Sequence, residues 1–126
     1  MHAKIEKLRK LKLLFVEDEQ DILDIISDTL TGLKVDFFVA KDGAEGLEIF
    51  KNNNDITIVV SDINMPVMNG LDMIREIRKL DSTVPCIIMS AHTEQEFKDE
   101  AQKLNVTEYM IKPFDFIKFL DIINEI

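Results

Sequence analysis

The sequence contains a single cysteine, Cys86, so no internal disulfide can form and a reduced, intracellular setting is expected. The thiol lies in the apolar run Cys86-Ile87-Ile88-Met89, where we interpret it as a small buried hydrophobic side chain. The sequence also lacks internal repeats and low-complexity segments. Its 126 residues therefore have the length of one domain with a single core.

Long apolar runs are missing as well. No run approaches the roughly 18 residues that span a bilayer. The N-terminus lacks the hydrophobic region of a signal peptide. We therefore expect a cytoplasmic protein that has no membrane partner.

Positive charge is scarce outside the first twelve residues. These twelve residues hold five basic residues and one acid, a net charge of +4. Because the whole chain has a net charge of −9, residues 13–126 carry −13. A domain this acidic lacks the basic surface that binds nucleic acid, so the expected partners are proteins or cations. Residues 1–11 form a basic leader, either an exposed arm or a short helix with Ile5, Leu8 and Leu11 in one stripe. Residues 12–126 are the expected domain.

Short apolar strands alternate with helical patterns along that domain. Strands are expected at 12–16, 34–40, 56–61, 85–89 and 108–111, and helices at about 22–30, 44–50, 71–78, 97–104 and 115–126. This alternation with short loops predicts an α/β fold, a parallel sheet with helices on both faces.

Asp62 follows the strand at 56–61, which is rich in β-branched residues and reads as buried on both faces. An isolated carboxylate inside such a sheet would be costly, so we expect its side chain at the mouth of the sheet. Two interpretations stay open from this stretch alone. Asp62 is either a reactive group or an ordinary residue that ends a strand and caps a turn.

Candidate site residues, nearly all of them polar, follow four of the five expected strands. In open α/β sheets, ligands bind outside the carboxyl ends of the strands, where these residues would gather. The set is Glu17, Asp18, Asp62, Asn64, Ser90, Ala91 and Lys112. Hard oxygen ligands favour Mg²⁺ or Mn²⁺, and a metal beside a carboxylate nucleophile suggests phosphoryl transfer onto Asp62. Lys112 and the Ser90 hydroxyl could each meet one phosphoryl oxygen.

Four motifs, in order and at matching strand ends, resemble the receiver domain of two-component response regulators, including the single-domain chemotaxis type. They are Phe15-Val16-Glu17-Asp18, Asp62-Ile63-Asn64-Met65-Pro66 with Gly70, Ser90-Ala91, and Tyr109-Met110-Ile111-Lys112-Pro113-Phe114. The resemblance covers about residues 12–126. It implies a flavodoxin-like doubly wound sheet in the order 2-1-3-4-5 with five helices.

The resemblance also implies a signalling domain that accepts a phosphoryl group and is not an enzyme. Asp62 would take the group from a sensor histidine kinase or phosphotransfer protein. Glu17, Asp18, Asp62 and the backbone carbonyl of Asn64 would bind Mg²⁺, and Lys112 and Ser90 would contact the phosphoryl group. Tyr109 would be the switch residue, and the Lys112–Pro113 bond is commonly cis in this family. A downstream protein or a missing effector domain would read the signal.

Other classes of protein fit the sequence less well. A flavodoxin needs a phosphate-cradling loop of glycine, serine and threonine where this chain has Glu17-Asp18-Glu19. An aspartate-nucleophile phosphatase usually carries a second acid where Asn64 stands. A degenerate receiver that acts only as a binding module, and a receiver excised from a larger regulator or hybrid kinase, stay as alternatives. His92 is either a loop residue or a group that tunes the lifetime of the phosphate.

The last expected helix has an unusually broad apolar face. At 100° per residue its apolar side chains cover an arc of about 220°, wider than one core requires. Ile117 and Ile122 are the expected exposed edges. One hypothesis is that this face binds a second copy or a missing C-terminal segment, and the alternative is that the leader folds over it.

Overall fold

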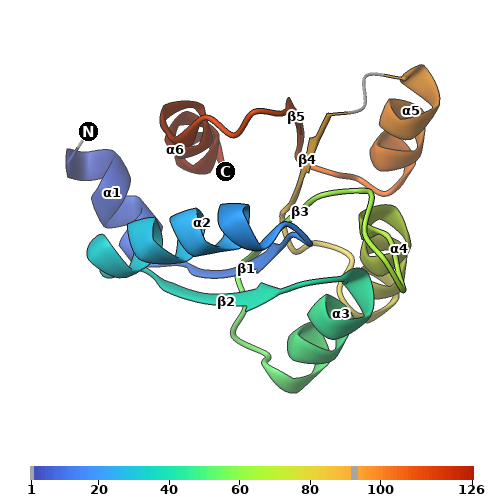
Figure 1. Cartoon of the computed structure of the whole chain (residues 1–126), viewed down its shortest axis with the longest axis horizontal. Coiled ribbons are helices and arrows are strands. Elements are labelled where there is room, and N and C mark those ends of the chain that lie inside the picture. The colour runs from blue at the N-terminus through green and yellow to red at the C-terminus, as the bar shows by residue number, and fades with distance from the viewer. Residues whose placement is uncertain (1, 92–93) are drawn as a thin grey trace.

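The computed structural model describes residues 2–91 and 94–126, in which five parallel strands form one sheet (Figure 1). The strands are β1 (Lys12–Val16), β2 (Asp36–Ala40), β3 (Ile58–Ser61), β4 (Cys86–Ser90) and β5 (Glu108–Ile111). Their order is β2-β1-β3-β4-β5, which confirms the expected doubly wound α/β fold.

Six helices surround the sheet in the described residues. They are α1 (His2–Arg9), α2 (Gln20–Gly32), α3 (Gly43–Asn52), α4 (Gly70–Leu80), α5 (Gln95–Lys103) and α6 (Phe116–Glu125). The expected number of five was one too few, because residues 2–9 of the leader also form a helix. No helix in the described part of the chain is long and apolar enough to cross a membrane.

The helices form two layers, one on each face of the sheet (Figure 1). Helices α1, α2 and α6 share one core, whose largest buried side chains are Phe15 and Phe119. Helices α3, α4 and α5 share the other, built around Met73, Ile74 and Ile77. Side chains alternate between the two cores along each central strand, because successive residues of a strand face opposite sides.

The three central strands are nearly completely buried, whereas the edge strands β2 and β5 expose part of their length. Cys86 begins the central strand β4 and is fully buried. Burial raises the pKa of its thiol to about 11. The interpretation of Cys86 as a small hydrophobic side chain is therefore confirmed.

The start of β2 lies two residues later than expected, at Asp36. Lys34 adopts a left-handed backbone conformation with φ of 61°, and the Val35 amide donates to the Leu30 carbonyl at 3.0 Å. This backbone bond closes the C-terminal end of α2. Residues 34 and 35 therefore belong to the turn that ends α2, and β2 begins after them.

Helix α1 packs against α6 and covers one edge of its apolar face. Leu8 is fully buried, and Lys4 pairs with Asp121. Ile122 is only 7% exposed, so the expectation that it forms an open edge was wrong. Ile117, which is 52% exposed, does form one. Helix α1 of the leader therefore covers part of the apolar face of α6 on which a second copy was expected to pack.

Candidate functional site

Two acids are fixed at the carboxyl ends of adjacent strands. Glu17 follows β1 and its amide donates to the Ala40 carbonyl at 3.0 Å, while the Asp62 amide after β3 donates to the Val16 carbonyl at 3.0 Å. Asp18 is next to Glu17 on the solvent side. One carboxylate oxygen from each of Glu17, Asp18 and Asp62 lies within 4.8 Å of the others. The structure therefore brings together the three acids that the sequence analysis selected.

Lys112 reaches this cluster from the end of β5. Its ammonium donates to Oε1 of Glu17 at 2.8 Å and to Oδ2 of Asp62 at 2.9 Å. Its backbone amide donates to the Ser90 carbonyl at 2.8 Å, which fixes the position of the residue beside β4. The Lys112–Pro113 peptide bond is cis, as the family resemblance implied.

Glu17 is fully buried, and this burial sets the electrostatics of the cluster. Burial raises the pKa of the Glu17 carboxyl, the hydrogen bond from Lys112 opposes the rise, and the nearby charge of Asp62 adds to it. Burial lowers the pKa of Lys112, but the hydrogen bonds to Glu17 and Asp62 outweigh it and the net shift is upward. One ammonium faces three carboxylates, so the cluster has negative charge left for another cation.

Backbone amides hold the carboxylates of Glu17 and Asp62 in one orientation. Oε2 of Glu17 accepts from the amides of Asp18 and Glu19 at 3.0 and 3.3 Å, and Oδ1 of Asp62 accepts from the Ile63 amide at 2.7 Å. Asp62 borders a surface cavity of about 230 Å³. The other residues that line it are Asp18, Glu19, Asn64, Ala91 and Lys112. A reagent arriving from solvent therefore meets Asp62, Asp18 and Lys112 together.

The donor set fits a hard divalent cation. Among the residues that the structure describes, the cluster offers three carboxylates and no histidine or cysteine, and Asn64 joins it at the cavity. Mg²⁺ binds through one or two carboxylates and keeps several waters, and both Asp18 and Asp62 border the open cavity. Glu17 is buried beneath them, so its carboxylate would face such an ion from the protein side of the site.

Ser90 and Tyr109 lie next to this site on β4 and β5. Ser90 is fully buried at the end of its strand, and its hydroxyl shares a hydrogen bond with the Tyr109 hydroxyl. Burial raises the pKa of Tyr109, and the hydrogen bond with Ser90 opposes that rise. Tyr109 is half-buried against the core of α3, α4 and α5. His92, also singled out in the sequence, lies outside the described residues.

Sequence reasoning gave no role to two residues that hold the Asp62 backbone. The Ser61 hydroxyl donates to the Asp62 carbonyl at 2.7 Å. A Cβ at Gly70 would lie 1.9 Å from that same carbonyl oxygen, so only glycine allows α4 to start this close to it. The sequence did indicate that Gly70 matters, because this glycine belongs to the motif that follows Asp62. Its role required the three-dimensional packing.

Comparison with known proteins identifies the family to which this site belongs. Residues 13–124 match the model of the response regulator receiver domain. A chemotaxis protein CheY homolog of Campylobacter jejuni is 34% identical over 107 residues, which cover 82% of each chain. Chemotaxis protein CheY of Thermotoga maritima is 31% identical over 117 residues, which cover 91% of this chain and 96% of that one.

Solved structures agree with the sequence relatives. A response regulator receiver domain protein from Clostridium thermocellum superposes with a TM-score of 0.83 at 33% identity, covering 91% of this chain and 92% of that one. Response regulator protein TrrA of Thermotoga maritima, solved in complex with Mg²⁺ and BeF, gives 0.79 at 26% identity over 91% and 97% of the two chains. With the family match, the relatives and the acidic site in agreement, the chain belongs to the receiver domains of two-component response regulators.

Proposed function

We propose that Asp62 is the phosphoacceptor of this receiver domain. A carboxylate oxygen of Asp62 attacks the phosphorus of a phosphohistidine on a sensor kinase or phosphotransfer protein. The P–N bond breaks as the new P–O bond forms, and the imidazole leaves with the electron pair of the broken bond. The product is an aspartyl phosphate, and the alternative of a degenerate receiver is not favoured.

Each neighbouring side chain has a part in this proposal. Asp18, Asp62 and the backbone carbonyl of Asn64 would hold Mg²⁺, with Glu17 supporting from below. The ion, when bound, supplies positive charge to the phosphoryl oxygens. Lys112 would leave its bond with Asp62 and pair with one phosphoryl oxygen, while Ser90 would donate to another. Mn²⁺ offers the same hard coordination and would substitute for Mg²⁺.

The observation that carries the proposal is the double hydrogen bond of Lys112. Its ammonium contacts Glu17 and Asp62 at 2.8 and 2.9 Å, from a strand two positions away in the sheet from the strand before Asp62. Such a contact places a fixed positive charge beside Asp62, which of the two carboxylate partners of Lys112 is the one that borders the cavity. A carboxylate that only ends a strand needs no such partner.

We propose that the signal leaves the site through Ser90 and Tyr109. If the Ser90 hydroxyl turns to a phosphoryl oxygen, it releases the hydrogen bond that now holds the Tyr109 hydroxyl. Tyr109 then repacks near the surface of β5 and α6, where Ile111 and Ile117 are exposed. A downstream protein, an effector segment or a second copy would read that change. With Ile122 covered, self-association would have to use Ile117 instead.

Intact-mass spectrometry after incubation with Mg²⁺ and acetyl phosphate tests the acceptor. The wild type is expected to gain one phosphoryl mass and Asp62→Asn none. Asp36→Asn is the matched control, because Asp36 is an exposed aspartate at the start of β2 and should be labelled normally. A labelled Asp62→Ala protein would remove Asp62 from the role, and an unlabelled wild type would favour a degenerate receiver.

Metal titration tests the ligand set. Asp18→Asn is expected to weaken Mg²⁺ binding more than Glu17→Gln, because Asp18 borders the cavity and Glu17 lies beneath it. Asp21→Asn, an exposed aspartate in the first turn of α2, should leave the affinity unchanged. Equal affinities in the wild type and Asp18→Asn would contradict the proposed site.

A further inference from the structure

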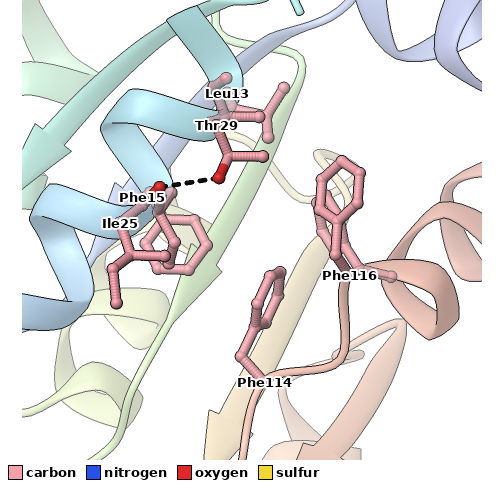
Figure 2. A pocket seen from close by; sticks show the side chains of 9 residues that line it. Leu13, Phe15, Ile25, Thr29, Phe114 and Phe116 are labelled. Carbon is pink, nitrogen blue, oxygen red and sulfur yellow. Dashed lines mark hydrogen bonds between the residues drawn. The ribbon is translucent and has the colours of Figure 1, made fainter. Parts of the chain in front are cut away.

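A cavity of about 190 Å³ lies between α2 and α6 on the face of the sheet away from α3, α4 and α5. Figure 2 shows Leu13, Phe15, Ile25 and Thr29 on one side of it and Phe114 and Phe116 on the other. Ile26, Leu30 and Phe119 complete the lining. Five of the nine lining residues are nearly completely buried, so the space reaches into the core of the domain.

The lining is almost entirely apolar and unusually rich in aromatic rings. Phe114 meets Phe15 edge to face with ring centroids 5.9 Å apart, and it lies 5.5 Å from Phe119. The one side-chain hydroxyl is that of Thr29, which donates to the Ile25 carbonyl at 2.8 Å (Figure 2). Because that hydroxyl already has an acceptor, the wall presents no side-chain donor that a polar ligand would need.

The size of the cavity selects the kind of occupant. An engineered cavity of about 150 Å³ lined by leucine, isoleucine and phenylalanine stays dry and binds benzene. The present space is somewhat larger, lined by the same residue types, and has rings placed for edge-to-face contacts. One aromatic ring fits its volume and its chemistry.

A protein partner fits this place poorly. An interface needs about 800 Å² from each partner, with several apolar side chains exposed for contact. Among the nine lining residues, Ile25 is the single large apolar side chain that is mainly exposed, at 65%. It stands at the mouth of the cavity. A second copy or a partner helix would therefore find one exposed contact and a space too small for its backbone.

We propose that this cavity is a binding site for a small, uncharged aromatic molecule with a single ring. The proposal is independent of phosphoryl transfer at Asp62. The site nevertheless adjoins the acidic cluster, because a second apolar cavity, of about 220 Å³, shares Ile25 and Phe114 with it and is also lined by Lys112 and Pro113. A ring bound against Phe114 would thus lie two residues from the lysine that bridges Glu17 and Asp62.

The test is an NMR titration of the full chain with benzene, followed through the methyl groups of Leu13, Ile26 and Leu30. Benzene is expected to produce saturable shifts at these methyl groups. Benzoate, which adds a charge to the same ring, should produce none, because the cavity has no partner for a carboxylate. Shifts that never saturate with benzene, or equal saturation with benzoate, would overturn the proposal.

Two threonines of α2 provide a matched pair of variants. Thr29→Phe should fill the cavity and abolish the saturable shifts, whereas Thr31→Phe should keep them, since Thr31 is exposed and does not line the cavity. If Thr29→Phe fails to give a dispersed spectrum, Ile25→Phe at the mouth replaces it. Benzene binding that survives either filling variant would contradict the site. So would a dimer in the wild type that the filling variant abolishes.

Discussion

The buried carboxyl group of Glu17 makes stability depend on pH in a defined direction. Its pKa is raised from the ordinary value of 4.5, so the folded protein holds this proton more tightly than the unfolded chain. Without metal, stability should therefore fall as the pH rises from about 4.5 through the folded pKa. We expect urea unfolding in EDTA to show this fall in the wild type.

Glu17→Gln isolates the effect, because it keeps the shape of the side chain and removes its titration. The stability difference between variant and wild type should grow in favour of the variant as the pH rises above about 4.5 and through the raised pKa of Glu17. Saturating Mg²⁺ should reduce the difference, since the ion supplies the missing positive charge. Parallel pH profiles for the two proteins would show that Glu17 does not carry the effect.

Val67 is strained where the loop after Asp62 turns. It is a β-branched residue with φ of 68°, it is 85% exposed, and the Met68 amide donates to the Pro66 carbonyl around it at 2.7 Å. A β-branched side chain at positive φ costs about 1–3 kcal/mol. Val67→Gly should therefore stabilise the protein by about 1 kcal/mol, because glycine has no Cβ and adopts positive φ without this cost.

Thermal unfolding measures the change at Val67, and about 1 kcal/mol corresponds to a rise of roughly 3–5 °C for a domain of this size. Val67→Ala is the control, since it removes the branch and keeps the Cβ, and it should recover only part of the gain. A melting temperature that Val67→Gly leaves unchanged or lowers would show that the turn stores no strain.

At the scale of elements, Arg78 joins α4 to the segments around it. Its guanidinium donates to the carbonyls of Leu104 and Val84 at 2.8 Å, to that of Asn105 at 3.2 Å and to that of Asp81 at 3.3 Å. These carbonyls belong to the end of α5, the end of α4 and the entry to β4. A lysine cannot reproduce this planar set, so Arg78→Lys should cost about 2 kcal/mol.

Arg75 is the natural control for Arg78, because it lies on the same helix and its partners are the exposed acids Asp72 and Glu100. Exposed pairs contribute at most about 1 kcal/mol, and Arg75→Lys keeps the charge. Urea unfolding of the two variants compares them directly. Equal losses would contradict the role given to the carbonyl contacts of Arg78.

Helix α1 shows how far an element can be predicted from its own residues. The stripe of Ile5, Leu8 and Leu11 indicated a helix as one of two alternatives. Its packing over the last helix was the alternative offered for the broad apolar face, and the contact between α1 and α6 confirms that alternative. The structure shows Leu8 buried and Arg9 donating to the Leu33 carbonyl at 2.7 Å, at the C-terminal end of α2. Lys7 donates to the carbonyls of Asn124 and Ile126 at the end of α6. Two basic side chains of the leader, Lys7 and Arg9, therefore stabilise the C-terminal ends of α6 and α2.

If the leader is part of the folded unit, its buried leucine must contribute to stability. Leu8→Ala should cost about 2–4 kcal/mol, as is usual for a leucine in a core. Lys10→Ala, an exposed change just after the helix, should be nearly neutral. Urea unfolding decides this. A neutral Leu8→Ala would mean that residues 1–11 are an attached arm, separate from the domain at 12–126.

At the scale of the whole molecule, the sequence was most informative where one physical rule acts alone. Alternating strands and helices, with acids at strand ends, predicted the sheet and the meeting of Glu17, Asp62 and Lys112. Ile122 was misjudged because exposure depends on a neighbour that is remote in sequence. The cavity between α2 and α6 was also not foreseeable, since a void results from the distances among many side chains.

The contact of Lys7 with the Ile126 carbonyl at 3.1 Å has a further consequence, because it brings the two ends of the chain together. From Lys7 to His2 is little more than one helical turn, so a flexible linker of roughly six residues would join the last residue to the first. The chain could then be opened at Asn54, an exposed residue of the loop between α3 and β3. A circular permutant of this kind should fold and accept a phosphoryl group, with the order of its elements in the gene changed and the order of its strands in the sheet kept.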